Sequence, residues 1–141
     1  MFLEFNKDNI EYEVSSDFVG GSLKGTVNTT YDKLKELFGK PTVDTSDPYE
    51  KVNCEWVIEG KVYFTDEDGE KDWEYVKGYV YNWKTGFVPV NEYDWHIGGD
   101  SYDVVEMIQT IVENELQPEY NWNCLLYTSD AADEGLGVDL G

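Results

Sequence analysis

The sequence predicts an α+β domain in which an antiparallel sheet of about five or six strands is covered by two helices. Three observations support this fold class. Short segments of alternating apolar and polar residues recur along the chain. Short reversals separate most of these segments, which favours antiparallel pairing. Two further segments, at about residues 30–39 and 101–116, have the apolar spacing of amphipathic helices.

The first part of the chain contributes three predicted strands and the first helix. The strands are residues 1–5, 10–14 and 22–28. Gly25 weakens the third strand, because glycine has no side chain to pack in a sheet. Thr30 is a typical N-cap residue, and Gly39 followed by Pro41 ends the helix. The helix is short and therefore needs a sheet to pack against.

The strongest strand pattern follows a polar loop at residues 42–50. Apolar residues alternate there with mostly polar ones, and this places one set of side chains in the core: Val52, Cys54, Trp56 and Ile58. We therefore expect Trp56 to be a core residue. Gly60 and Lys61 are predicted to turn the chain, so that residues 62–65 return as a separate strand.

Two further strands are predicted before the second helix. The acidic segment 65–70 is expected to be a hairpin turn, because it lacks the ligand spacing of a calcium-binding loop. Residues 73–81 form the next strand, in which Gly78 marks a bulge or a close approach of another segment. Residues 87–90 are predicted to be a short edge strand.

The second helix follows a segment with unusual chemistry. Residues 93–101 contain His96, the only histidine of the chain, and a Gly-Gly pair. Asp100 and Ser101 are N-cap residue types, and Asp103 has the spacing of a capping box. The glycines are therefore expected at the entrance to a helix.

This segment and a turn at Trp83 and Lys84 together form the candidate ligand site. Glycines let a ligand approach the backbone closely, and the first N–H groups of a helix are free donors beside a positive dipole end. The tryptophans would stack on a ring, and the lysine would neutralise a phosphate. The candidate ligand-binding residues are Trp83, Lys84, Trp95, His96, Gly98 and Gly99.

The same segment also allows a purely structural interpretation. A Gly-Gly pair is commonly only a turn. Asp100 and Asp103 already complement the helix dipole and would repel a second anion. A single histidine beside a tryptophan is commonly a packing residue. Both interpretations stay open from the sequence.

The composition limits the classes of function that the chain can have. Thirty acidic and ten basic residues give a formal charge of −20, so direct binding of nucleic acid through a basic patch is not expected. No segment has the length of a membrane span, and the first residues lack the apolar stretch of a signal peptide. With two cysteines and no Cys/His cluster, neither a metal nor a cofactor is expected.

The last residues of the chain have a different character. Residues 124–141 show no apolar period, and residues 124–133, Cys-Leu-Leu-Tyr-Thr-Ser-Asp-Ala-Ala-Asp, resemble the in-frame translation of a transposase-type sequencing adapter. Such a segment is not expected to contribute to the function of the protein. We therefore predict a single α+β domain over residues 1–123 and an adapter-derived or disordered tail over residues 124–141.

Four motifs resemble those of a widespread family of small bacteriophage proteins. They are residues 30–42, Cys54-Glu55-Trp56, Tyr81-Asn82-Trp83-Lys84-Thr85-Gly86 and Asp94-Trp95-His96-Ile97-Gly98-Gly99. The Trp-His-Ile-Gly-Gly motif is the most distinctive, and the resemblance covers about residues 28–116. The family has no settled activity, but small accessory phage proteins of this kind often resemble counter-defence proteins. The resemblance implies a setting, which is the cytoplasm of an infected bacterium.

Three hypotheses about function follow, beside a fourth possibility that the protein is a structural or virion component. We favour a binding protein over an enzyme. The first is a phage counter-defence protein that sequesters a nucleotide immune signal of the cyclic dinucleotide or ADP-ribose type, often at the interface of a homo-oligomer. The second is an acidic DNA mimic or a protein-binding inhibitor of a host defence protein, which the charge supports. The third, a metal-free nuclease that uses His96, is the least favoured because such cleavage normally needs a second acid or base.

Deletion of residues 124–141 is expected to leave the thermal midpoint of unfolding nearly unchanged. A segment that was not selected together with the domain supports little of its core. Thermal unfolding followed by circular dichroism, on residues 1–123 and on the full chain, measures the difference. A fall of many degrees after the deletion would contradict the assignment of the tail.

Overall fold

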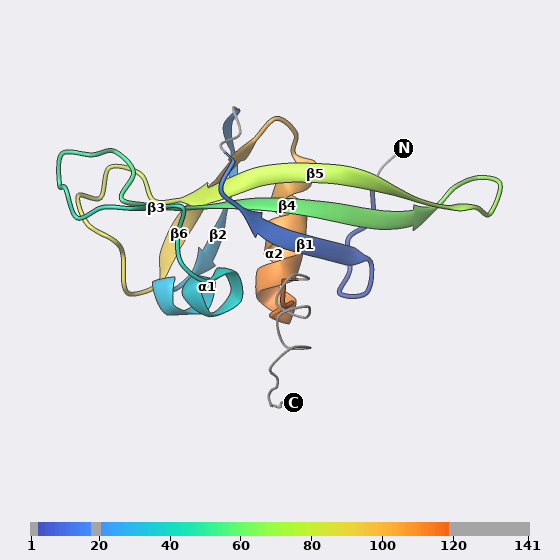
Figure 1. The fold of residues 1–141 in the computed structure, drawn as a ribbon, viewed down its shortest axis with the longest axis horizontal. Helices are drawn as coiled ribbons and strands as arrows, with labels where there is room; N and C mark the ends of the chain where they lie inside the picture. Colours follow the sequence, from blue (N-terminus) through green and yellow to red (C-terminus); the bar gives the residue numbers. More distant parts are fainter. Residues whose placement is uncertain (1–2, 18–20, 119–141) are drawn as a thin grey trace.

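Six strands form one antiparallel sheet, and two helices lie together on one of its faces (Figure 1). The computed structural model describes residues 3–17 and 21–118. The elements are β1 (Ile10–Ser15), β2 (Ser22–Thr29), α1 (Tyr31–Phe38), β3 (Val43–Asp44), β4 (Cys54–Thr65), β5 (Lys71–Tyr81), β6 (Tyr93–Gly99) and α2 (Asp103–Asn114). The strand order is β1-β4-β5-β6-β2, with β3 beside β4. The predicted α+β class is confirmed.

Strands β4 and β5 form one long hairpin at the centre of the sheet. Their pairing is continuous over eleven residue pairs. The predicted turn at Gly60 and Lys61 was wrong, because both residues lie inside β4 and pair with β5. The chain turns at residues 66–70 instead, where an acidic hairpin turn was predicted and where Gly69 has a φ of 82°.

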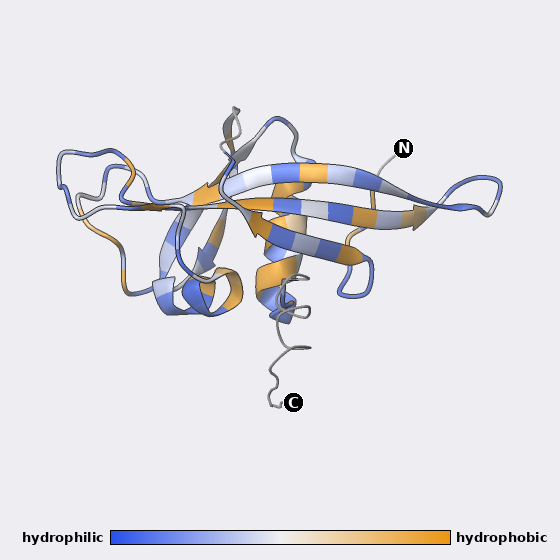
Figure 2. Cartoon of the chain, in the orientation of Figure 1, coloured by the Kyte–Doolittle hydropathy of each residue, from blue (hydrophilic) through white to orange (hydrophobic). Residues whose placement is uncertain are grey.

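The alternation of side chains along β4 and β5 gives the sheet two different faces (Figure 2). Even-numbered residues of both strands face the helices, and Trp56 among them is 0% exposed, which confirms it as a core residue. Odd-numbered residues lie on the opposite face, here called the helix-free face. A second, smaller apolar cluster forms there from Val57, Tyr79 and Tyr81, with Val52 packed against it.

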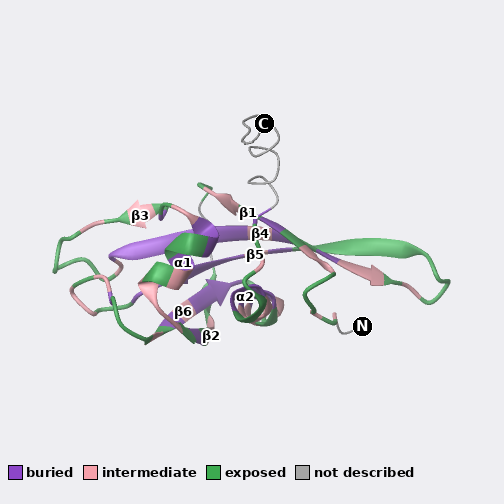
Figure 3. Cartoon of the chain, turned by 90° about the horizontal axis from the view of Figure 1, so that it is seen from below, coloured by how far each residue is buried: buried purple, intermediate pink, exposed green. Residues whose placement is uncertain are grey.

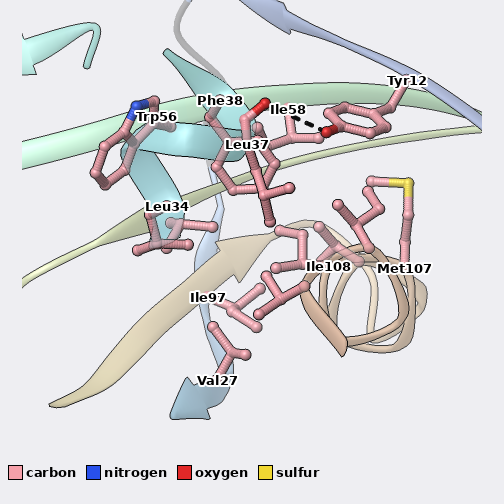
Figure 4. Close-up of a cluster of buried hydrophobic side chains, with 14 of the residues drawn as sticks. Tyr12, Val27, Leu34, Leu37, Phe38, Trp56, Ile58, Ile97, Met107 and Ile108 are labelled. Atoms are coloured by element: carbon pink, nitrogen blue, oxygen red, sulfur yellow. Dashed lines mark hydrogen bonds between the residues drawn. The ribbon is translucent and has the colours of Figure 1, made fainter. Parts of the chain in front are cut away.

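The main core lies between the sheet and the two helices (Figure 4). Two hydrogen bonds attach the end of α1 to the sheet: the Tyr12 hydroxyl donates to the Leu37 carbonyl at 3.4 Å, and the Trp56 indole N–H donates to the Gly39 carbonyl at 2.8 Å. The buried side chains of the helices are Leu34, Leu37 and Phe38 of α1, and Val104, Met107, Ile108, Ile111 and Val112 of α2.

The two helices begin in different ways. Helix α1 begins after Thr30, whose side-chain oxygen accepts a hydrogen bond from the Lys33 backbone N–H at 3.2 Å, as predicted. Helix α2 begins after Tyr102, whose side chain makes no capping hydrogen bond. The predicted capping by Asp100 and Ser101 was therefore wrong. Packing against the sheet, rather than a cap, sets the position of α2.

Four neighbouring strands each place a glycine under α2, and these residues are here called the glycine track. They are Gly60 of β4, Gly78 of β5, Gly99 of β6 and Gly25 of β2. An added Cβ would lie 2.1 Å from Val104 Cγ2 at Gly78 and 2.5 Å from Met107 Sδ at Gly60. Because no real side chain fits such distances, the track lets α2 rest on the sheet backbone. Gly78 thus marks a close approach, whereas the bulge of the sheet lies in β2.

Three predicted segments differ from the structure. Residues 3–5 are not a strand, because the Asn9 side chain donates to the Glu4 and Tyr63 carbonyls at 2.6 and 3.0 Å in place of a strand ladder. The first two residues of that prediction lie outside the described residues. Residues 87–90 form no strand, consistent with Pro89 lacking an N–H. The polar loop at residues 42–50 contains the short strand β3, which pairs with β4.

Gly78→Ala is expected to lower the free energy of unfolding by about 3 kcal/mol, the upper end of the usual effect of overpacking a core. Its Cβ would meet Val104 and the Gly98 carbonyl oxygen, which is backbone and cannot move aside easily. Gly60→Ala is the matched control, with a loss of about 1 kcal/mol, because its Cβ meets mainly the flexible end of Met107. Urea titration measures both, and equal losses would contradict this account of the track.

Candidate functional site

Tyr81 is the centre of the candidate site, at the end of β5 on the helix-free face. Its partners in the sheet are Glu55 on β4 and His96 on β6. The centroid of its ring lies 5.4 Å from the His96 ring and 6.2 Å from the Trp83 ring. Strands β4 and β6 and the loop after β5 therefore bring a carboxylate, an imidazole and an indole around one tyrosine. This group, together with the two lysines beside the indole, is here called the Tyr81 site.

Trp83 provides an aromatic surface with two lysines beside it. The residue is 40% exposed. The ammonium groups of Lys51 and Lys84 lie 5.9 and 5.6 Å from the centroid of its ring, within reach of a cation–π contact. In a chain with ten lysines, no arginine and a charge of −20, two lysines on one indole form a local concentration of positive charge.

A buried pair of asparagines holds the loops that carry these side chains. Asn53 and Asn82 are both 0% exposed. The Asn82 side-chain oxygen accepts from the Asn53 backbone N–H at 2.8 Å, and its amide donates to the Thr85 hydroxyl at 2.7 Å. The Lys84 backbone N–H donates to the Lys51 carbonyl at 2.7 Å. The two loops with lysines are therefore fixed to each other by hydrogen bonds, and the bond between Asn53 and Asn82 is buried.

Lys84 has an unfavourable backbone conformation. Its φ is 57°, in the left-handed region that glycine and asparagine adopt most readily. A residue with a Cβ pays about 1–2 kcal/mol for this conformation. The surrounding hydrogen bonds maintain it, and non-glycine residues held in this way occur often at functional sites. The conformation therefore fixes the path of the loop that carries the Lys84 side chain.

His96 is half-buried between two tyrosines. Its Nδ1 lies 3.5 Å from the Tyr93 hydroxyl, and this hydroxyl accepts the Trp83 backbone N–H at 3.2 Å. Burial lowers the pKa of His96, and the nearby Asp94 carboxylate opposes that effect in part. The imidazole is therefore neutral at pH 7. It offers hydrogen bonds to a ligand, while the positive charge of the site comes from the lysines.

Glu55 is a largely buried residue whose carboxylate accepts no hydrogen bond from the described residues, although its oxygen atoms are not themselves fully buried. It is 7% exposed, beside Tyr81 and close to Val57. No side chain in residues 3–17 and 21–118 donates a hydrogen bond to it or forms an ion pair with it. Burial raises the pKa of Glu55, and burial followed by the Glu55 charge raises the pKa of Tyr79. Burial therefore disfavours the charged form of Glu55 in the folded protein.

Three of the six predicted ligand-binding residues come together at the Tyr81 site: Trp83, Lys84 and His96. The other three lie elsewhere. Trp95 is 0% exposed in the main core, with its ring 5.7 Å from that of Trp56. The Tyr79 ring covers Gly98, where an added Cβ would lie 2.6 Å from it, and Val104 covers Gly99. The glycine pair thus lies inside β6 under packed side chains, rather than at an open helix entrance.

Three residues of the site were not predicted from the sequence. Tyr81 belongs to the same motif as Trp83 and lies two residues before it. Strand alternation could therefore have placed Tyr81 and Trp83 on the same face. Glu55 also alternates with core residues, but its neighbour Tyr81 depends on the register of β4 and β5. Lys51 carries no local signal, because its contact with Trp83 depends on how two loops meet.

Other reactive groups of the described chain do not extend the site. Burial, then the charges of Asp44 and Glu55, raise the pKa of the Cys54 thiol to about 12, so this cysteine stays protonated. Cys124 lies outside the described residues. No group of His, Cys, Asp and Glu within residues 3–17 and 21–118 is arranged to hold a metal ion. None of the helices described there has the length and apolar character needed to cross a membrane.

Comparison with known proteins gave no relative. No family model, no curated protein and no solved structure matches the chain. The resemblance to a bacteriophage family therefore stays a prediction.

Glu55→Gln is expected to raise the free energy of unfolding at pH 7 by about 1 kcal/mol, the order of the penalty for a buried polar group without a partner. The gain should depend on pH. Because burial raises the pKa of Glu55 in the folded state, the folded protein keeps this proton to a higher pH than the unfolded chain does. The native protein therefore loses stability as pH rises from the unfolded pKa, about 4.3, through the folded one.

Thermal unfolding of the native protein and the variant, measured at several pH values from 4 to 8, tests this expectation. The difference should be small near pH 4 and reach its full size above the folded pKa. Glu13→Gln, at an exposed position of β1, is the control for the loss of one negative charge. A Glu55→Gln variant that is less stable than the native protein at pH 7 would show that the carboxylate has a stabilising partner.

Proposed function

We propose that the protein binds a small anionic ligand with an aromatic base, that is, a nucleotide, at the Tyr81 site. The observation that carries the proposal is the convergence of Lys51 and Lys84 on the exposed ring of Trp83. A base that stacks on an aromatic side chain contributes about 1–3 kcal/mol. Two ammonium groups beside the same ring would neutralise a phosphate.

The geometry supports binding of the ligand rather than its cleavage. Metal-free cleavage of a phosphodiester normally needs an acid and a base that act on one bond. His96 and Glu55 lie on opposite sides of Tyr81, two strands apart, which is about 10 Å at the usual strand spacing. The two groups are too far apart to share one reacting bond. The protein is therefore proposed to sequester its ligand.

The resemblance to a bacteriophage family adds a setting to this proposal. In the cytoplasm of an infected bacterium, the ligand would be a nucleotide immune signal of the cyclic dinucleotide or ADP-ribose type. Sequestration would lower the free concentration of the signal and so delay the host response. The protein would then act as a counter-defence sponge.

A second candidate function is the binding of a host protein through the projecting end of the β4–β5 hairpin (Figure 3). Trp73 and Tyr75 are 46% and 54% exposed on the helix-free face of this end, next to the acidic turn at residues 66–70. Strand β5 pairs with β6 only at residues 78–81, so within the described chain its edge at residues 71–77 has no neighbour on that side. Exposed aromatic residues and free strand edges are typical of protein-binding surfaces.

Lys51→Ala, Lys84→Ala and His96→Ala are each expected to weaken nucleotide binding by about 1–3 kcal/mol, the range for a lost hydrogen bond to a charged group. Isothermal titration against a panel of cyclic dinucleotides and ADP-ribose derivatives measures the affinities. Lys61→Ala is the matched control, because the Lys61 ammonium lies 4.8 Å from the Trp73 ring centroid, a similar pair outside the site.

The fold should survive all four substitutions, and circular dichroism checks this directly. If no member of the panel binds the native protein, the nucleotide proposal fails and the second candidate takes its place. If Lys61→Ala weakens binding as much as Lys84→Ala does, the ligand lies at the hairpin rather than at the Tyr81 site.

A further inference from the structure

We infer that the ligand of the Tyr81 site carries a guanine-type base, whose adjacent N–H donors pair with the carboxylate of Glu55. The inference rests on the proposed function and names the chemical class of its ligand. It starts from one structural fact: Glu55, a residue that is 7% exposed, lies beside the aromatic part of the site, and its carboxylate receives no side-chain donor from the described residues.

The Tyr81 site has two ends of opposite charge. At one end, Lys51 and Lys84 surround the exposed ring of Trp83. At the other, Glu55 pairs with Tyr81 across β4 and β5, and the Tyr81 ring lies 6.2 Å from the Trp83 ring. A guanine nucleotide has the matching polarity, with anionic phosphates at one end and N–H donors on the far edge of its base.

The chemistry of the bases decides which one the carboxylate selects. Guanine presents a ring N–H and an exocyclic amino group side by side, and the two oxygens of a carboxylate accept both. Adenine and cytosine present an amino group beside a ring nitrogen whose lone pair would face the carboxylate. Uracil and thymine present one N–H between two carbonyl oxygens. Guanine alone among these five supplies two adjacent donors.

The energetic state of Glu55 supports a role in binding. Val57 and Tyr79 lie around it on the helix-free face, so an apolar residue would pack there without desolvating a charge. A group that destabilises the free protein and gains its hydrogen bonds from a ligand is typical of a recognition site. A site built around such bonds also rejects ligands that lack the donors.

The guanidinium group of an arginine likewise presents two parallel donors to a carboxylate. A second copy of this chain cannot supply one, because the chain has ten lysines and no arginine. An arginine-rich partner would also bring its positive charge against Lys51 and Lys84. The positive end of the site therefore favours a ligand with a negative end, which a guanine nucleotide has.

Isothermal titration of the full chain with matched nucleotides tests the inference. GMP against AMP, and cyclic di-GMP against cyclic di-AMP, differ only in the base. We expect the guanine member of each pair to bind at least tenfold more tightly. Inosine monophosphate keeps the ring N–H but lacks the amino group, and we expect its affinity to lie between those of GMP and AMP.

Glu55→Gln should remove the preference for guanine, because the amide replaces one acceptor oxygen with a donor. The variant is expected to stay folded, so a lost preference is not a lost fold. Glu13→Gln removes the same charge from an exposed position of β1 and should leave the preference intact.

The possible results separate this inference from the proposed function. Equal binding of guanine and adenine nucleotides would overturn the inference and leave nucleotide binding standing. A preference for guanine that survives Glu55→Gln would overturn the role of Glu55. Tighter binding of an oligoarginine peptide than of GMP, lost in Glu55→Gln, would assign the carboxylate to arginine. If no nucleotide binds at all, the proposed function fails together with the inference.

Discussion

Helix α2 rests directly on the backbone of the sheet, and the positions of both the core and the candidate site depend on this contact. Glycines from four neighbouring strands leave the space that the helix occupies. Within this track, Gly78 of β5 pairs with Gly99 of β6, and three residues farther along each strand Tyr81 pairs with His96. The packing of α2 on one face of the sheet therefore fixes the register that brings the tyrosine and the histidine together on the other face.

Features of the fold that depend on neighbouring residues in the sequence could be predicted, whereas features that depend on contacts between distant segments could not. Alternation along a strand is local, so it correctly predicted that Trp56 is buried and that the sheet has two faces. The role of a glycine is not local. Gly60 was predicted to turn the chain and Gly99 to admit a ligand, yet both lie under α2. A glycine in a turn and a glycine beneath a helix look alike until the neighbouring strands are known.

The same distinction applies to the candidate site. Trp83, Lys84 and His96 could be predicted from the sequence because each is an unusual residue type in its surroundings. Glu55 is one of thirty acidic residues, and only the register of β4 and β5, which sets it against Tyr81, distinguishes it from the others. The missing side-chain donor for its carboxylate is likewise a property of the packed structure, because only the packing shows that no described side chain donates to it.

The charge of −20 and the proposed anionic ligand are compatible because electrostatic interactions in salt solution have a short range. At physiological ionic strength the screening length is about 8 Å, so distant carboxylates act weakly on a small ligand in contact with Lys51 and Lys84. A nucleic acid is too long to contact only the two lysines. Its other phosphates would lie close to the acidic surface and be repelled by it. The lysine pair and the acidic surface would then act together: the first attracts a small anion, and the second excludes the long polyanions that are far more abundant in a cell.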